Sequence, residues 1–74
     1  MLEAKDFIKH CDILLCEIER AADYIKYDID NDVEYKFLIS LVEDIDNGKK
    51  TYTTQLVMHI SLLIGRVQER VKIG

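Results

Sequence analysis

The sequence predicts a small all-α protein, a three-helix antiparallel bundle with two long helices and one short middle helix. Apolar residues recur at alternating spacings of three and four over long stretches, which indicates helices with one buried face. The 74 residues include no proline and only three glycines, whereas sandwiches and barrels need many turn residues. This length is enough for a single domain, residues 1–74, and too short for two.

The first helix is expected from about residue 3 to residue 27. Residues 27–32 then combine three aspartates with one asparagine, and these side chains compete with helical hydrogen bonds. Phe7, Leu14 and Ala21 widen the apolar stripe on one flank. The stripe itself consists of Ala4, Ile8, Cys11, Leu15, Ile18, Ala22, Ile25 and Ile29.

The second helix is expected from about residue 32 to residue 46. Asn31 and Glu34 have the spacing of a capping box at its start, and Asn47 and Gly48 can take the left-handed conformation that ends a helix. Its predicted apolar face consists of Tyr35, Leu38, Leu41, Val42 and Ile45.

The third helix is expected from about residue 52 to residue 72, with Thr51 or Thr53 as its N-cap. A short strand over residues 51–57 is an alternative for the start of this segment, because β-branched residues are frequent there. The predicted stripe of the helix consists of Val57, Ile60, Ile64, Val67 and Val71.

The unequal helix lengths favour more than one copy of the chain. The long helices extend about 10 Å beyond the short one, and a domain of this size buries only about 60% of its surface. Met58 and Leu62 form an apolar ridge on the far side of the third helix, where Gly65 lets another helix approach closely. We therefore expect a homodimer or higher oligomer, with an interface formed by Ile8, Leu15, Ile18, Met58 and Leu62.

No motif for catalysis, metal binding or a cofactor is present in the sequence. A calcium loop starting at Asp28 would need glycine and glutamate at its sixth and twelfth positions, where this chain has Val33 and Ile39. Cys11 lies in the apolar stripe, and Cys16 lies about 140° around the helix, so the two cannot form a disulfide within the helix. We expect neither an enzyme nor a metalloprotein.

Charge is unevenly distributed along the chain. Residues 1–47 carry a net charge of −8 and residues 48–74 a net charge of +4. Tyrosine is favoured at interface centres, and surrounding acids steer a basic partner toward them. The predicted partner-binding surface is therefore the first corner of the bundle, which is the turn between the first and second helices. Its residues are Tyr24, Tyr27, Asp28, Asp30, Asp32 and Tyr35.

These observations favour a non-enzymatic protein–protein interaction module, an inhibitor or regulator that docks on a basic surface of another protein. An inhibitor fits, because blocking needs only a surface. The small, acidic, all-helical chain with many Ile, Asp, Lys and Tyr residues favours a viral or mobile-element antagonist of a host protein. A purely structural oligomerisation subunit is one alternative. The other is binding of nucleic acid, a nucleotide or an anion through Lys49, Lys50, Thr51, Arg66 and Arg70, although the acidic half of the chain disfavours phosphate.

A cytoplasmic location is expected, because the first residues lack a basic segment followed by an apolar run. No membrane contact is expected either, since no apolar run approaches the ~20 residues of a spanning helix.

Overall fold

The structure is a computed structural model that describes residues 2–72, and over this range it is all-helical. Helix α1 spans Ala4–Ile25, α2 spans Val33–Asp46 and α3 spans Thr54–Arg70, with a short 3-10 turn, η1, at Ile29–Asn31. The prediction of an all-α chain with three helices is confirmed. Residues 51–53 form no strand, and α3 begins directly after them.

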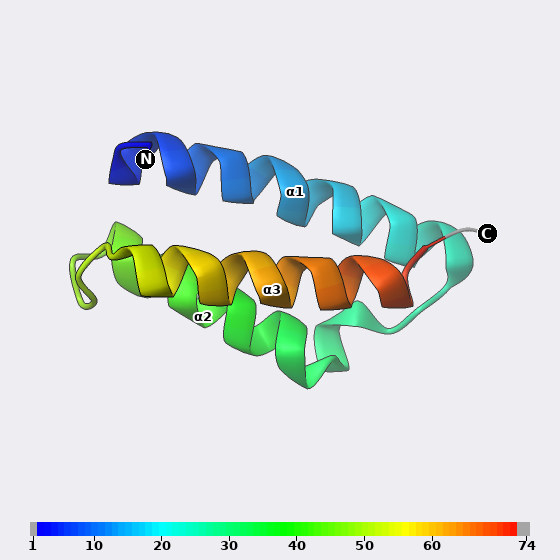
Figure 1. The fold of residues 1–74 in the computed structure, drawn as a ribbon. Helices are drawn as coiled ribbons and strands as arrows, with labels where there is room; N and C mark the ends of the chain where they lie inside the picture. Colours follow the sequence, from blue (N-terminus) through cyan, green and yellow to red (C-terminus); the bar gives the residue numbers. More distant parts are fainter. Residues whose placement is uncertain (1, 73–74) are drawn as a thin grey trace.

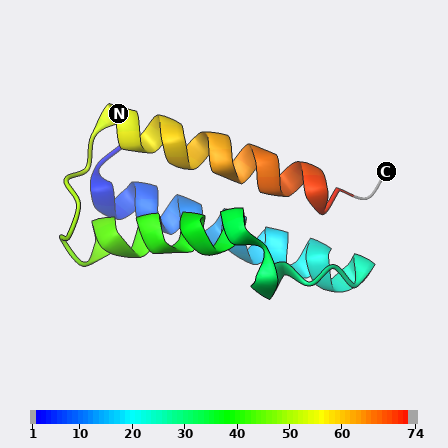
Figure 2. The ribbon, with the colours of Figure 1, turned by 90° about the horizontal axis from the view of Figure 1, so that it is seen from below.

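The three helices lie side by side around one core. Helices α1 and α3 run in the same direction, and α2 runs in the opposite direction (Figures 1 and 2). Helix α2 contacts both α1 and α3, which also contact each other. No helix in the described part of the chain is long and apolar enough to cross a membrane.

The core follows the predicted apolar face of α2 closely, whereas on α1 the flanking Phe7 is buried and the stripe residues Ile8 and Leu15 are only half-buried. Every residue of the face predicted for α2 is buried, and so are Cys11, Ile18 and Ala22 on α1. On α3, Val57 is half-buried at the edge of the core. The buried α3 residues and the residue that follows the helix are Ile60, Leu63, Ile64, Val67 and Val71.

The first corner differs from the prediction. Helix α1 stops at Ile25 because Lys26 takes a left-handed conformation, φ 59°, and its N–H bonds to the carbonyls of Ala22 and Asp23. Ile25 is consequently exposed rather than part of the stripe. The chain then turns back beneath the end of α1 (Figure 1), which buries Ile29 in the core. Ile29 thereby covers part of the apolar surface that unequal helix lengths would leave open.

Helix capping also corrects one expectation. Asn31 and Glu34 form no capping box: Asp32 is the N-cap of α2, and its Oδ1 accepts the N–H of Tyr35 at 2.9 Å. The capping box is absent because Glu34 points to α3 instead. At α3, the expected N-cap Thr53 accepts the N–H of Leu56 at 3.2 Å.

The second connection ends α2 and leads into α3. Gly48 takes the expected left-handed conformation with φ 74°, whereas Asn47 does not, with φ −88°. The carbonyl of Asp44 accepts the N–H groups of Lys49 and Lys50. These bonds hold the basic pair at the α2 end of the connection.

Candidate functional site

A groove of about 540 Å³ opens at the corner between α1 and η1. We call it the acidic groove. Its α1 wall carries residues at spacings i, i+3, i+4 and i+7, which lie on one face of a helix. The wall on the other side comes from the connection and η1. Its lining residues are Cys16, Glu19, Arg20, Asp23, Tyr27, Asp28, Ile29 and Asp30.

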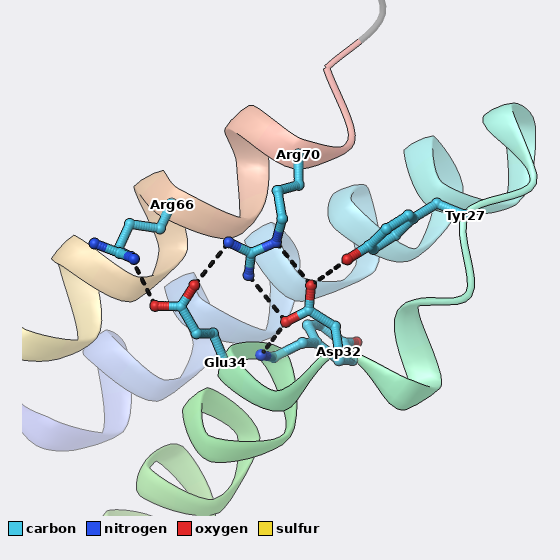
Figure 3. Close-up of polar contacts among 6 residues, drawn as sticks. Tyr27, Asp32, Glu34, Arg66 and Arg70 are labelled. Carbon is cyan, nitrogen blue, oxygen red and sulfur yellow. Dashed lines mark hydrogen bonds and ion pairs between the residues drawn. The ribbon is translucent and has the colours of Figure 1, made fainter.

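A polar cluster beside the groove ties three parts of the chain together (Figure 3). The Arg70 guanidinium donates from Nε to Asp32 Oδ2 at 2.8 Å and from a terminal nitrogen to Asp32 Oδ1 at 2.9 Å. The Tyr27 hydroxyl donates to the same Oδ2 at 2.6 Å. The Asp32 side chain is only 4% exposed, so a buried carboxylate joins the end of α3, the start of α2 and the connection.

Glu34 extends this cluster along the surface between α2 and α3. Its carboxylate lies 2.7 Å from Arg70 on one side and 2.7 Å from Arg66 on the other (Figure 3). The hydrogen bond from Arg70 lowers the pKa of Glu34, and it lowers the pKa of Asp32 far below its usual range. Both acids are therefore ionised partners of cations within the fold.

The α1 wall of the groove is anchored by Tyr35. This side chain is 2% exposed, and its hydroxyl donates to Glu19 Oε1 at 2.6 Å. Burial, followed by the bond to the Glu19 carboxylate, raises the pKa of Tyr35, so the phenol stays protonated and keeps donating. The Glu19 carboxylate is thereby held at a fixed place in the groove wall.

The predicted partner-binding residues are divided by the structure. Asp28 and Asp30 are exposed in the acidic groove, and Tyr24 is 76% exposed on α1. Asp32 and Tyr35, in contrast, are buried and occupied by contacts inside the fold, so neither belongs to an exposed docking surface.

Tyr27 is half-buried, with its hydroxyl directed at Asp32 and part of its side chain in the groove wall. Sequence reasoning missed Cys16, Glu19 and Arg20 as groove residues. Their spacing on α1 was a usable signal, but only the return of the connection beneath α1 makes that face a wall.

The residues suggested for anion binding do not form one site. Lys49, Lys50 and Thr51 lie in the second connection, before the start of α3, and Arg70 lies at its far end, roughly 24 Å away along the helix axis. Arg66 and Arg70 are, in addition, paired with Glu34 and Asp32. Both arginines of α3 are thus paired with carboxylates of the same chain.

The residues suggested for the oligomer interface differ in how far they are exposed. Ile18 is 2% exposed and belongs to the core, so it cannot contact another chain while this chain is folded. Ile8 and Leu15 are half-buried against the core. Only Met58 and Leu62, at 67% and 61% exposed, project from the surface.

A scan against models of known protein families finds no match to this chain, and searches of curated proteins and of solved structures find none either. What bears on its function is therefore the geometry of its own residues, above all the acidic groove.

Proposed function

We propose that this chain is a small non-enzymatic protein–protein interaction module whose acidic groove binds a basic segment of another protein. The single observation that carries the proposal is the charge of the groove lining. Four carboxylates, those of Glu19, Asp23, Asp28 and Asp30, line it against one cation, Arg20. A cleft lined by one sign of charge concentrates the field and attracts ligands of the opposite sign.

The groove walls are held in place before any partner arrives. Glu19 is fixed by Tyr35, Tyr27 by Asp32, and Asp28 by Asn31 through a bond of 2.5 Å. A preformed site loses less conformational freedom on binding than a flexible one. Two of the four groove carboxylates, those of Glu19 and Asp28, are thus held in place by contacts within the chain.

Lysine and arginine side chains match both the charge and the size of the groove. Its volume of about 540 Å³ lies within the range of ligand-binding clefts. The apolar stems of such side chains can lie along Tyr27 and Ile29 while their charged ends meet the carboxylates. Exposed Tyr24 offers an aromatic face to a second cation.

Inhibition or regulation is the kind of activity that this surface supports. Covering a basic surface needs no reacting group, and a basic surface is what proteins use to hold nucleic acid. We propose that the chain covers a basic, nucleic-acid-binding surface of a host protein. It would thereby block that protein, as a viral or mobile-element antagonist does. The unit that does so is a three-helix antiparallel bundle acting as a homodimer.

A lysine- and arginine-rich peptide of about ten residues tests the groove directly. Its dissociation constant is measured by calorimetry at low and high salt, and its contacts are mapped by amide chemical shifts. Binding should shift the amides of Glu19, Asp23, Asp28 and Asp30 and should weaken as salt rises, because exposed charges are screened.

A charge-matched pair of variants separates groove binding from general attraction. Asp23→Asn with Asp30→Asn removes two groove acids, and Glu43→Gln with Asp46→Asn removes two exposed acids near the far end of α2. The groove variant should bind the peptide about tenfold more weakly, and the α2 variant nearly as well as the native chain. Equal losses in both variants, or no binding to the native chain, would refute the proposal.

A further inference from the structure

The outer face of α3 is exposed, and over residues 54–65 it is uncharged. Residues 51–65 contain no Asp, Glu, Lys or Arg, although these types make up 32% of the chain. Depletion of charge together with exposed methionine is typical of the centre of a protein interface. Up to residue 65, the exposed residues on this side of α3 are Thr54, Gln55, Met58, Ser61, Leu62 and Gly65, and Glu69 is the first charged residue on this side, one turn further on.

Gly65 lies at the edge of a second groove, between α1 and α3, with a volume of about 440 Å³. Its apolar lining comes from half-buried Ala21 and from the core residues Ile18 and Val71, of which only 2% and 3% are exposed. A Cβ atom at Gly65 would meet no other atom within 4 Å, so packing inside the chain does not require glycine there. Glycine within a helix is nevertheless destabilising, which indicates that the open space serves a contact outside the chain.

The spacing of Met58 and Gly65 allows Met58 of one copy to pack against Gly65 of a second copy. They lie seven residues apart on the same side of α3, about 10 Å along its axis. A two-fold axis that is perpendicular to α3 and passes outside it, at the level of Ser61 and Leu62, relates two antiparallel α3 helices. It places Met58 of each copy over Gly65 of the other, and a two-fold interface requires this self-complementarity.

We propose that a second copy of this chain packs antiparallel against the outer face of α3, with each Met58 entering the groove beside Gly65 of the other copy. This inference rests on the homodimer part of the proposed function and names the surface that forms it. The acidic groove lies between α1 and η1 and includes no residue of this face.

Charge favours this antiparallel arrangement. Each chain has a net charge of −4, so two copies approach most easily through a surface whose centre lacks carboxylates, as residues 51–65 do. Around the proposed axis, the Lys49–Lys50 connection that precedes α3 in one copy comes toward the C-terminal end of α3 in the other. There, Glu17, Glu69 and Lys72 line the second groove, and Lys72 lies 3.6 Å from Glu69. At both ends of the dimer, the lysine pair of one copy thus comes toward Glu17 and toward the Glu69–Lys72 ion pair of the other.

The solvent-accessible surface of the chain is also consistent with one face being covered by a second copy. The chain has a mass of 8.6 kDa and a solvent-accessible surface of 5176 Å². A monomer of this mass is expected to expose about 4,700 Å². Covering the excess on both copies would bury about 950 Å² in total, which is the size of a small interface.

Light scattering over a range of concentrations, with reductant present, tests the proposal. The native chain should form a dimer. Gly65→Gln fills the open space beside the groove and Met58→Gln makes the inserted side chain polar, and each should raise the dimer dissociation constant about tenfold or more. Both variants should stay folded, because neither side chain is part of the core.

Ile13→Gln is the matched control. Ile13 is 59% exposed on α1, so the same change to glutamine there removes an equally exposed apolar side chain. This variant should remain as dimeric as the native chain. A dimer that survives both α3 variants, or is lost in the control, would overturn the proposed surface while leaving the homodimer in place. A native chain that stays monomeric would overturn both, without bearing on peptide binding in the acidic groove.

Cross-linking tests the antiparallel orientation. In a Cys16→Ser background, chains with Met58→Cys are mixed with chains with Gly65→Cys and oxidised. Disulfides should join the two different variants, because a disulfide requires Cα atoms within about 7 Å. Links that form in the Met58→Cys chain alone would indicate parallel helices and overturn the arrangement.

Discussion

At the scale of single residues, Asp32 makes more tertiary contacts than its position in a polar turn suggests. It caps α2, pairs with Arg70 through two hydrogen bonds and accepts a third from Tyr27. All buried side-chain nitrogens and oxygens in the described range have partners, so this cluster is complete. A buried carboxylate of this kind is costly without its partners and stabilising with them.

Asp32→Asn should destabilise the chain by about 2 kcal/mol, because Arg70 loses the more buried of its two charged partners and keeps only Glu34. Urea unfolding at neutral pH measures this loss. Asp30→Asn, an exposed neighbour, should change the free energy of unfolding by less than about 0.5 kcal/mol. Equal effects of the two substitutions would contradict the role given to Asp32.

The same carboxylates predict how stability depends on pH. The folded-state pKa values of Asp32 and Glu34 lie below their ordinary values, so the unfolded chain binds more protons in acid. Their contribution to stability is complete at neutral pH and is lost as the pH falls below about 4. Acid unfolding should be shallower in Asp32→Asn than in the native chain; equal slopes would argue against ionised Asp32.

The two cysteines should react at very different rates. Cys16 is exposed, whereas Cys11 is buried, and burial raises the pKa of its thiol to about 11. Because the thiolate is the reactive form, an aromatic disulfide reagent at neutral pH should titrate one thiol per folded chain and two in denaturant. Two rapidly reacting thiols in the folded chain would contradict the packing of α1.

At the scale of the helices, the end of α1 is set by Lys26 in a left-handed conformation. This position usually favours glycine, and the chain lacks it there. The missing glycine explains why the first helix was predicted to continue to about residue 27 and why Ile25 was assigned to the core.

Lys26→Gly should stabilise the chain by about 0.5–1 kcal/mol, because glycine adopts a left-handed conformation without a Cβ penalty. Lys36→Gly, at an exposed position inside α2, should destabilise it by about 1 kcal/mol. Thermal unfolding followed by circular dichroism measures both changes. A loss of stability in Lys26→Gly would show that the left-handed residue does not limit α1.

At the scale of the whole molecule, one core connects the three helices. Ile18, Leu38 and Ile60 are each no more than 2% exposed and come from α1, α2 and α3 in turn. The chain should therefore unfold as one cooperative unit rather than helix by helix.

Ile18→Asp should unfold the entire chain, because it places an unpaired charge in the shared core. Ile13→Asp, on the exposed side of the same helix, should leave helical circular dichroism and the unfolding midpoint nearly unchanged. A folded Ile18→Asp chain would show that α1 is not part of a common core.

The three helices and most of their buried faces could be predicted from the sequence, because helical periodicity and caps such as Thr53 depend on residues a few positions apart. Which polar side chains are buried depends instead on the tertiary structure. Arg70 reaches Asp32 across 38 positions and Tyr35 reaches Glu19 across 16. Those contacts, like the wall that the connection adds to the acidic groove, depend on how the helices are placed against one another, and local spacing carries no record of that placement.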